Sequence, residues 1–158
     1  MATFAKLDSD NKVIQFLTVD DSDALTEEEG ITFLHKTFKT SADTVTWKQG
    51  SRNTIQGKYY TPEDHSVLGD QSKAFRLNAP GVGDTYDAAL DGFIKPQPFP
   101  SWIQNNTTGH WDSPIPQPDP STLPKVINGG TGAEEEPIAF RWNEAAYQAD
   151  NTQGWEAT

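Results

Sequence analysis

The sequence predicts a β-rich α+β fold, in which a small N-terminal unit of a β-hairpin and a helix is followed by extended proline-rich segments that carry short aromatic β-hairpins. Three observations predict it. Two apolar runs, at 4–7 and 13–19, flank a cluster of turn-forming residues at 8–12. Eight prolines lie between 96 and 124, and they exclude a long central strand because proline fixes φ and lacks an N–H donor. Aromatic residues also recur in pairs around polar turns that contain glycine.

The N-terminal hairpin and the helix that follows it form the expected globular body. The arm at 13–19 is apolar at nearly every position, so we expect a central strand that is covered on both faces. Thr26 is the expected start of the helix, because Glu29 stands three residues on, as in a capping box. Apolar residues then follow at helical spacing to about Lys39. His35 lies on this apolar stripe, where we expect a packed side chain rather than a ligand.

Residues 44–48 alternate β-branched and aromatic side chains and predict a third strand. Between 49 and 83, glycine and proline recur every few residues, which indicates an irregular excursion from the core. We expect three segments along the chain. These are a β-α body with this insertion at 1–83, proline-flanked hairpins at 84–127, and a glycine hinge with a last aromatic hairpin at 128–158.

Three stretches, 86–93, 102–111 and 142–155, place an aromatic residue on each side of a polar turn. We interpret each as a β-hairpin and the proline-rich stretches as semi-rigid spacers. Two roles of the rings stay open. Rings that face one another across a hairpin stabilise it by about 0.2–1 kcal/mol per pair. Alternatively, the rings are exposed anchors for a partner, because isolated hairpins are too small to bury them. The candidate partner-binding residues are Tyr86, Phe93, Phe99, Trp102, Trp111, Trp142 and Trp155.

Charge and composition indicate that the partners are proteins. The net charge is -11, with 23 acidic and 12 basic residues, whereas nucleic-acid grooves and contacts with anionic membranes need clustered Lys and Arg. We therefore expect neither nucleic acid nor membrane as a partner. Apolar residues make up only 34% of the chain, while aromatic residues reach 11% and include five Trp. This balance predicts a thin core that is stabilised by large rings.

The sequence singles out no catalytic residue, no metal ligand and no cofactor site, so we expect a non-enzymatic protein. Cysteine is absent, and His35, His65 and His110 do not have the spacing of a metal site. The acidic clusters at 8–11 and 20–23 lack the Gly and Glu that complete a calcium-binding loop, and turn chemistry explains them. Carbohydrate stacking on the aromatic rings and a hydrolytic pair of carboxylates stay open as alternatives, although no particular pair stands out.

Short sequence blocks occur in a characteristic order along most of the chain. The blocks are F-A-K-L-D at 4–8, N-K-V at 11–13, W-K-Q at 47–49, T-Y-D-A-A-L-D-G-F-I at 85–94, P-F-P-S-W at 98–102 and F-R-W-N-E at 140–144. With these blocks, the chain resembles a group of small proteins encoded by marine tailed phages, notably those of cyanobacteria. It departs from the group at 49–83, where it is longer than we expect.

The resemblance implies a structural accessory protein of the virion, synthesised in the host cytoplasm. Such a protein decorates or cements the head, or the tail and neck surface, through contacts with capsid, tail or neck subunits or with copies of itself. The aromatic hairpins are also similar to those of tail-fibre assembly proteins. The alternative is therefore a tail-fibre assembly chaperone or a host-surface, glycan-binding adhesin.

Overall fold

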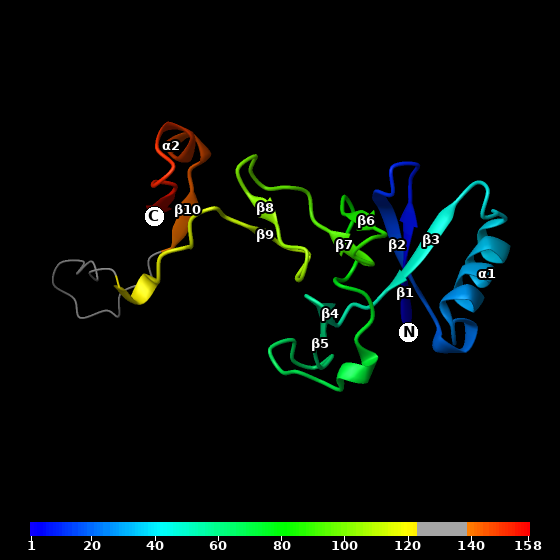
Figure 1. Ribbon diagram of the computed structural model, residues 1–158. Helices are drawn as coiled ribbons and strands as arrows, with labels where there is room; N and C mark the ends of the chain where they lie inside the picture. The colour runs from blue at the N-terminus through cyan, green and yellow to red at the C-terminus, as the bar shows by residue number, and fades with distance from the viewer. Residues whose placement is uncertain (123–138) are drawn as a thin grey trace, which may run out of the picture. The chain divides into compact units, whose positions relative to one another are not determined.

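A computed structural model describes residues 1–122 and 139–158 (Figure 1). As expected, the fold is β-rich, with 18% helix and several small antiparallel hairpins. The chain divides into unit 1, at 1–97 and 104–111, and unit 2, at 98–103 and 112–158. The glycine hinge expected at 128–132 lies outside the described residues. The strands and α-helices are β1 (Ala2–Leu7), β2 (Val13–Val19), α1 (Glu27–Phe38), β3 (Thr46–Gly50), β4 (Thr54–Ile55), β5 (Lys58–Tyr59), β6 (Thr85–Asp87), β7 (Gly92–Ile94), β8 (Ile103–Gln104), β9 (Trp111–Asp112), β10 (Phe140–Trp142), α2 (Glu144–Ala149) and β11 (Trp155–Ala157).

A three-stranded antiparallel sheet with the order β2-β1-β3 organises unit 1. The N-terminal hairpin and the third strand are thereby confirmed, with β3 two residues later than predicted. The expectation that the 13–19 strand is central is wrong, because β1 takes that position. Phe4 and Ala5 of β1 are fully buried on opposite faces, while β2 forms an edge. Apolar content alone does not distinguish the two strands, since it says nothing about their order in the sheet.

Helix α1 covers one face of the sheet, along β3 (Figure 1). It begins as predicted: Thr26 Oγ1 accepts from the N–H of Glu29 at 3.2 Å, and Glu29 Oε2 accepts from the N–H of Thr26 at 3.1 Å. Gly30 permits close packing on the sheet, because a Cβ there would lie 2.1 Å from Cζ of Phe4. His35 is packed as expected, with Nδ1 3.0 Å from Thr40 Oγ1. The buried residues of this face are Ala2, Phe4, Val19, Ala24, Leu34 and Trp47.

The hairpin of β6 and β7 covers the other face of the sheet. Its register pairs Tyr86 with Phe93, as the sequence predicts, and both rings pack with Ala5, Leu7 and Val13. A register shift in the β1-β2 ladder leaves one extra residue on β2 between the pairs Lys6↔Gln15 and Leu7↔Val13. Because of this extra residue, Val13 shares the face of Leu7 and reaches the second cluster.

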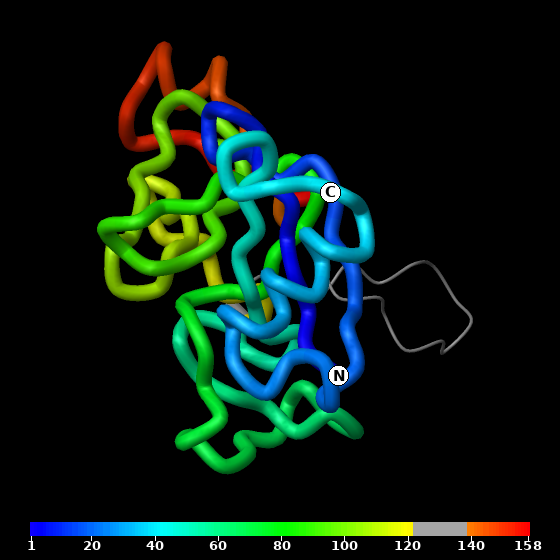
Figure 2. The backbone as a smooth tube through the Cα atoms, turned by 90° about the vertical axis from the view of Figure 1, so that its right-hand side faces the viewer, coloured from blue at the N-terminus to red at the C-terminus, as the bar shows by residue number. Residues whose placement is uncertain are grey.

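The chain between β3 and β6 forms the irregular excursion that its glycine and proline content predicts. It contains only the short pair of β4 and β5 and a 3₁₀ turn at Gln71–Lys73. In both backbone views it loops out at the lower end of unit 1 (Figures 1 and 2). The fully buried Thr54 holds two parts of the excursion together, because its hydroxyl accepts a hydrogen bond from the backbone N–H of Phe75 at 3.2 Å.

Unit 2 contains the pair of β10 and β11, in which Trp142 lies opposite Trp155. The pairing of these rings is confirmed, but the expected polar turn between them includes α2. Asn143 starts this helix, since its Oδ1 accepts from the N–H of Ala146 at 3.0 Å. Gly154 then allows close packing: a Cβ there would lie 2.5 Å from the Trp142 ring. The middle hairpin is also present, as the pair β8 and β9.

Candidate interaction surface

Side chains close the outer edge of β3 at Gln49. The backbone N–H of Gln49 donates to Glu27 Oε1 at 2.9 Å, and its carbonyl accepts from Nη1 of Arg76. Arg76 also donates from Nη1 and Nη2 to the two carboxylate oxygens of Glu27, at 3.1 and 3.0 Å. An exposed strand edge offers unpaired donors and acceptors to other chains. At Gln49 both groups are already satisfied, so the edge is blocked at this residue.

The same arginine holds the β6-β7 hairpin. Arg76 Nε donates to Asp91 Oδ1 at 2.8 Å, and the Tyr86 hydroxyl donates to the same oxygen at 2.7 Å. Burial acts to raise the pKa of Asp91, but the hydrogen bonds from Tyr86 and Arg76 outweigh it and hold the pKa below 3.8. Burial also raises the pKa of Tyr86, with its bond to Asp91 adding to the effect. The Arg76 side chain is only 6% exposed, so it belongs to the framework of unit 1.

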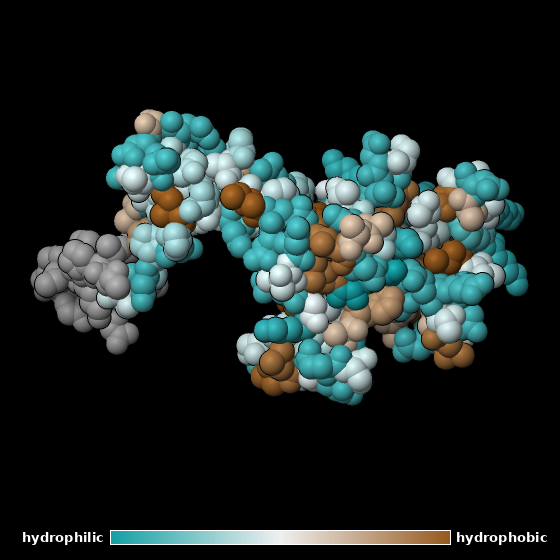
Figure 3. Space-filling view, viewed as in Figure 1, coloured by the Kyte–Doolittle hydropathy of each residue, from teal (hydrophilic) through white to brown (hydrophobic). Residues whose placement is uncertain are grey.

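The outer edge of β2 is open, in contrast to that of β3. Only its first residue is engaged: the N–H of Val13 donates to Asp84 O at 2.7 Å, and its carbonyl accepts from the N–H of Gly83 at 2.8 Å. Beyond Val13, the sole strand that pairs with β2 in the described chain is β1. Ile14 and Phe16 are 48% and 47% exposed on this strand. Over the face seen in Figure 3, hydrophobic residues form small patches separated by hydrophilic ones.

No charged side chain lies within β2, whose sequence is V-I-Q-F-L-T-V. Edge strands that are protected against pairing commonly carry Lys, Pro or an inward-pointing charge, and residues 14–19 have none of these. We therefore define the open edge as residues 14–19 of β2. The sequence signal for it is the uncharged run itself, which fits an open edge as well as a buried central strand.

Three of the predicted partner-binding residues lie in the interior. Tyr86 and Phe93 are 8% and 1% exposed, with ring centroids 5.5 Å apart, and Trp142 is 5% exposed. Their rings are paired across strands, which is the first of the two roles considered from the sequence. They are not exposed anchors in this structure, because the sheet and the neighbouring rings of each unit bury them.

The partly buried Phe99, Trp102 and Trp155 form one aromatic cluster with Trp142 in unit 2. The Trp102 ring lies 6.0 Å from that of Trp142, 6.1 Å from that of Trp155 and 5.6 Å from that of Phe99. Trp142 and Trp155 are 5.3 Å apart, edge to face. The expectation of separate small hairpins is therefore wrong for Trp102, Trp142 and Trp155, which come from two predicted hairpins and share one cluster, together with Phe99 of the proline-rich segment.

Glu144 links Ser101 and Trp142 of this unit through hydrogen bonds. Its Oε2 accepts from the Ser101 hydroxyl at 2.6 Å and from the Trp142 indole N–H at 2.9 Å. These bonds lower the pKa of Glu144. Trp155 donates from Nε1 to Ile115 O at 2.9 Å. Unit 2 thus satisfies the polar ends of Trp142 and Trp155 internally.

Trp111 belongs to unit 1 and is not a member of this cluster. Its indole N–H donates to Lys95 O at 2.8 Å, and the ring is partly buried. The middle hairpin is real, but its strands begin after Trp102, so Trp102 and Trp111 do not form a cross-strand pair. A partner-binding role for Trp111 stays a prediction.

Comparisons of the chain with protein-family models, with curated proteins and with solved structures gave no match. Among residues 1–122 and 139–158, no helix has both the length and the apolar character needed to cross a membrane.

Proposed function

We propose that this chain is a non-enzymatic structural accessory protein of a tailed-phage particle, attached to other virion proteins through the open edge of β2. The ordered sequence blocks that resemble marine phage proteins support the virion assignment. The observation that carries the mode of attachment is the contrast between the two edges of the sheet. Arg76 and Glu27 occupy the backbone groups of Gln49 on β3, while 14–19 of β2 present a strand with Ile14 and Phe16 half exposed.

Strand addition explains how such a surface attaches. An incoming strand adds main-chain hydrogen bonds along β2, and apolar side chains of the partner cover Ile14 and Phe16. Removing half of each side chain from water contributes about 25 cal/mol per Å² of apolar area. Because β2 has no charge, pairing there buries no unpaired ion.

An inventory of purified particles tests the assignment to the virion. Mass spectrometry of particles of the phage that encodes the chain should find the polypeptide at a fixed ratio to the major capsid protein. Its presence in infected cells but absence from finished particles would instead indicate an assembly chaperone, and the proposal would be wrong.

A charge placed on β2 tests the mode of attachment. We expect Phe16→Lys to reduce recovery of the chain with particles at least about tenfold, because pairing would then bury an unpaired ammonium group. Phe38→Lys is the matched control: Phe38 is 50% exposed, and its ring stacks on Trp47 at 6.1 Å. The control loses a ring contact and gains the same charge, but leaves β2 intact. Equal recovery of both folded variants would exclude the open edge as the attachment site.

A further inference from the structure

The register of the sheet determines which backbone groups of β2 point outward. In an antiparallel sheet, consecutive residues direct their N–H and C=O groups to opposite sides of the strand. Gln49 of β3 directs its groups away from the sheet and stands opposite Phe4 of β1, so the groups of Phe4 point to β2. Phe4 pairs with Leu17, whose groups therefore point back to β1. The neighbours of Leu17 on the strand, Phe16 and Thr18, consequently point outward.

The outward-pointing part of β2 is bounded at both ends. At its start, the outward groups of Val13 are taken by the N–H of Gly83 and the carbonyl of Asp84. At its end, the strand stops at Val19 and a 3₁₀ turn follows at 21–23. Between these limits, the outward N–H and C=O groups of residues 16 and 18 bind no other group in the described chain.

This short edge is complementary to itself, because one outward-pointing residue lies on each side of Leu17. A second copy of β2 laid antiparallel, with a two-fold axis beside Leu17, pairs Phe16 of each copy with Thr18 of the other. Each pair exchanges both of its N–H···O bonds, so every outward donor and acceptor of the two residues is satisfied. Phe16, which is 47% exposed, then packs on the second copy's Thr18. The two Leu17 side chains meet on the face covered by α1.

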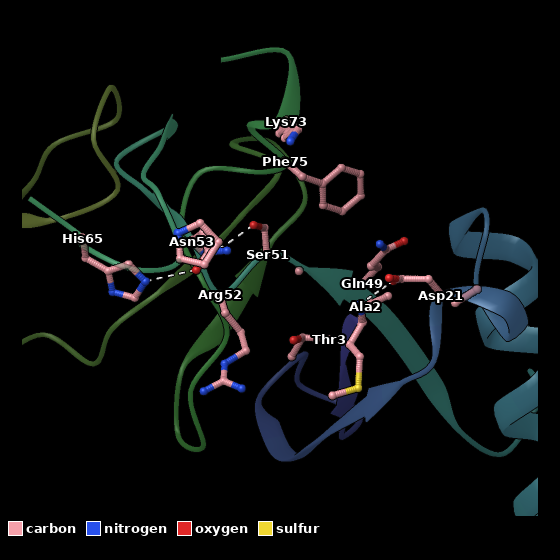
Figure 4. A pocket seen from close by; sticks show the side chains of 14 residues that line it. Ala2, Thr3, Asp21, Gln49, Ser51, Arg52, Asn53, His65, Lys73 and Phe75 are labelled. Carbon is pink, nitrogen blue, oxygen red and sulfur yellow. Dashed lines mark hydrogen bonds and ion pairs between the residues drawn. The ribbon is translucent and has the colours of Figure 1, made fainter. Parts of the chain in front are cut away.

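The charges that flank β2 favour the antiparallel orientation. Three aspartates follow the strand at 20–23, and one of them, Asp21 on the wall of the cavity shown in Figure 4, pairs with the Met1 ammonium group. The turn before the strand, at 8–12, holds two aspartates and Lys12. A parallel copy would set the two more acidic ends side by side. An antiparallel copy sets each of them beside the turn that contains Lys12, which reduces the repulsion.

We propose that a second copy of this chain covers the open edge of β2 before the virion partner does, in a two-fold antiparallel dimer. The inference rests on the proposed function, because it gives the same edge two successive occupants. An unpaired, uncharged edge strand pairs readily with other chains, and the dimer keeps this one paired until attachment. The paired segment is short and each copy carries a net charge of -11. The dimer is therefore weak, and a virion partner replaces the second copy.

Sedimentation equilibrium of the isolated full chain tests the dimer. We expect the mass to rise from 17.4 kDa toward twice that value between micromolar and millimolar concentrations, and to rise further with added NaCl, which screens the repulsion. Thr18→Pro removes an outward N–H and should raise the dissociation constant at least about tenfold. Thr18→Val is the matched control, because it keeps the N–H and the β-branched shape. A monomer at every concentration, or equal dissociation constants for the two variants, would overturn the proposal.

A single introduced thiol tests the register, because the chain has no cysteine. Residues that face one another without exchanging hydrogen bonds have Cα atoms about 4.5 Å apart, which is within the range of about 4.4–6.8 Å for a disulfide. Leu17→Cys, beside the two-fold axis, should therefore give a covalent dimer under mild oxidation. Gln15→Cys is the control on the same face of the strand, since Gln15 stands opposite Val19 of the second copy. Equal cross-linking of the two variants would contradict the proposed register.

The dimer and the attachment to the virion are tested on different samples. The dimer is measured on the isolated chain, and attachment is measured on purified particles. A monomeric chain that is present in particles overturns the dimer and leaves the proposed function standing. A dimeric chain that is absent from particles overturns the proposed function and leaves the dimer standing.

Discussion

Single aspartates close many of the turns in this acidic chain. In five Asp-x-Ser or Asp-x-Thr stretches the Asp carboxylate accepts from the backbone N–H two residues on, at 2.8–3.0 Å. In each case hydrogen bonds from the Ser or Thr hold the pKa of the aspartate below 3.8. The acidic cluster at 20–23 follows this pattern, as the sequence predicts. The five aspartates are Asp20, Asp64, Asp70, Asp119 and Asp150.

Asp91 differs from these residues because its partners are distant in the sequence. Its folded-state pKa is lowered, so its contribution to stability is complete above about pH 4 and is lost as the pH falls through the folded pKa. We expect Asp91→Asn to flatten the dependence of the unfolding free energy on pH between about pH 4 and pH 2. Urea unfolding at several pH values measures this slope. An unchanged slope in the variant would mean that Asp91 does not contribute to it.

Roles that depend on residues close together in the sequence were predictable, whereas roles that depend on contacts between residues far apart in the sequence were not. The capping box of Thr26 and Glu29 was visible because the two residues are three apart. By contrast, Arg76 meets Glu27 across 49 residues and Gln49 across 27, and no spacing rule links them. The sequence alone shows only the cost of Gly30, since glycine inside a helix is about 1 kcal/mol less favourable than alanine. Its benefit, room for the Phe4 ring, depends on packing that the sequence does not encode locally.

Among the secondary-structure elements, local turn signals were reliable and strand order was not. The pairing of Tyr86 with Phe93 and of Trp142 with Trp155 was predictable from aromatic residues that flank polar turns. Helix α2 was overlooked, although Asn143 followed by Glu144 and two alanines is a helix start signal. A cavity of about 550 Å³, whose lining includes Arg52 and Lys73, was not predictable either, because the lining comes from four separate stretches of the chain.

The aromatic cluster is the element on which unit 2 depends. Trp142 is 5% exposed and contacts the rings of Trp102, Trp155 and Tyr147, and truncating a buried Trp costs about 3–5 kcal/mol. We expect Trp142→Ala to abolish hydrogen-exchange protection of the amides in α2 and β11. Trp111→Ala is the control, because Trp111 belongs to unit 1. Retained protection in Trp142→Ala would contradict a central role for the cluster.

At the scale of the whole molecule, the excess of 23 acidic over 12 basic residues sets the response to salt. Like charges repel one another in the folded chain, and salt screens this repulsion with a Debye length of about 10 Å at 0.1 M. We expect added NaCl to raise the thermal midpoint at pH 7, and to raise it less near pH 4.5, the isoelectric point. Differential scanning calorimetry at both pH values measures the two shifts. Salt destabilisation at pH 7 would instead show that ion pairs, such as that of Arg76 with Glu27, outweigh the net repulsion.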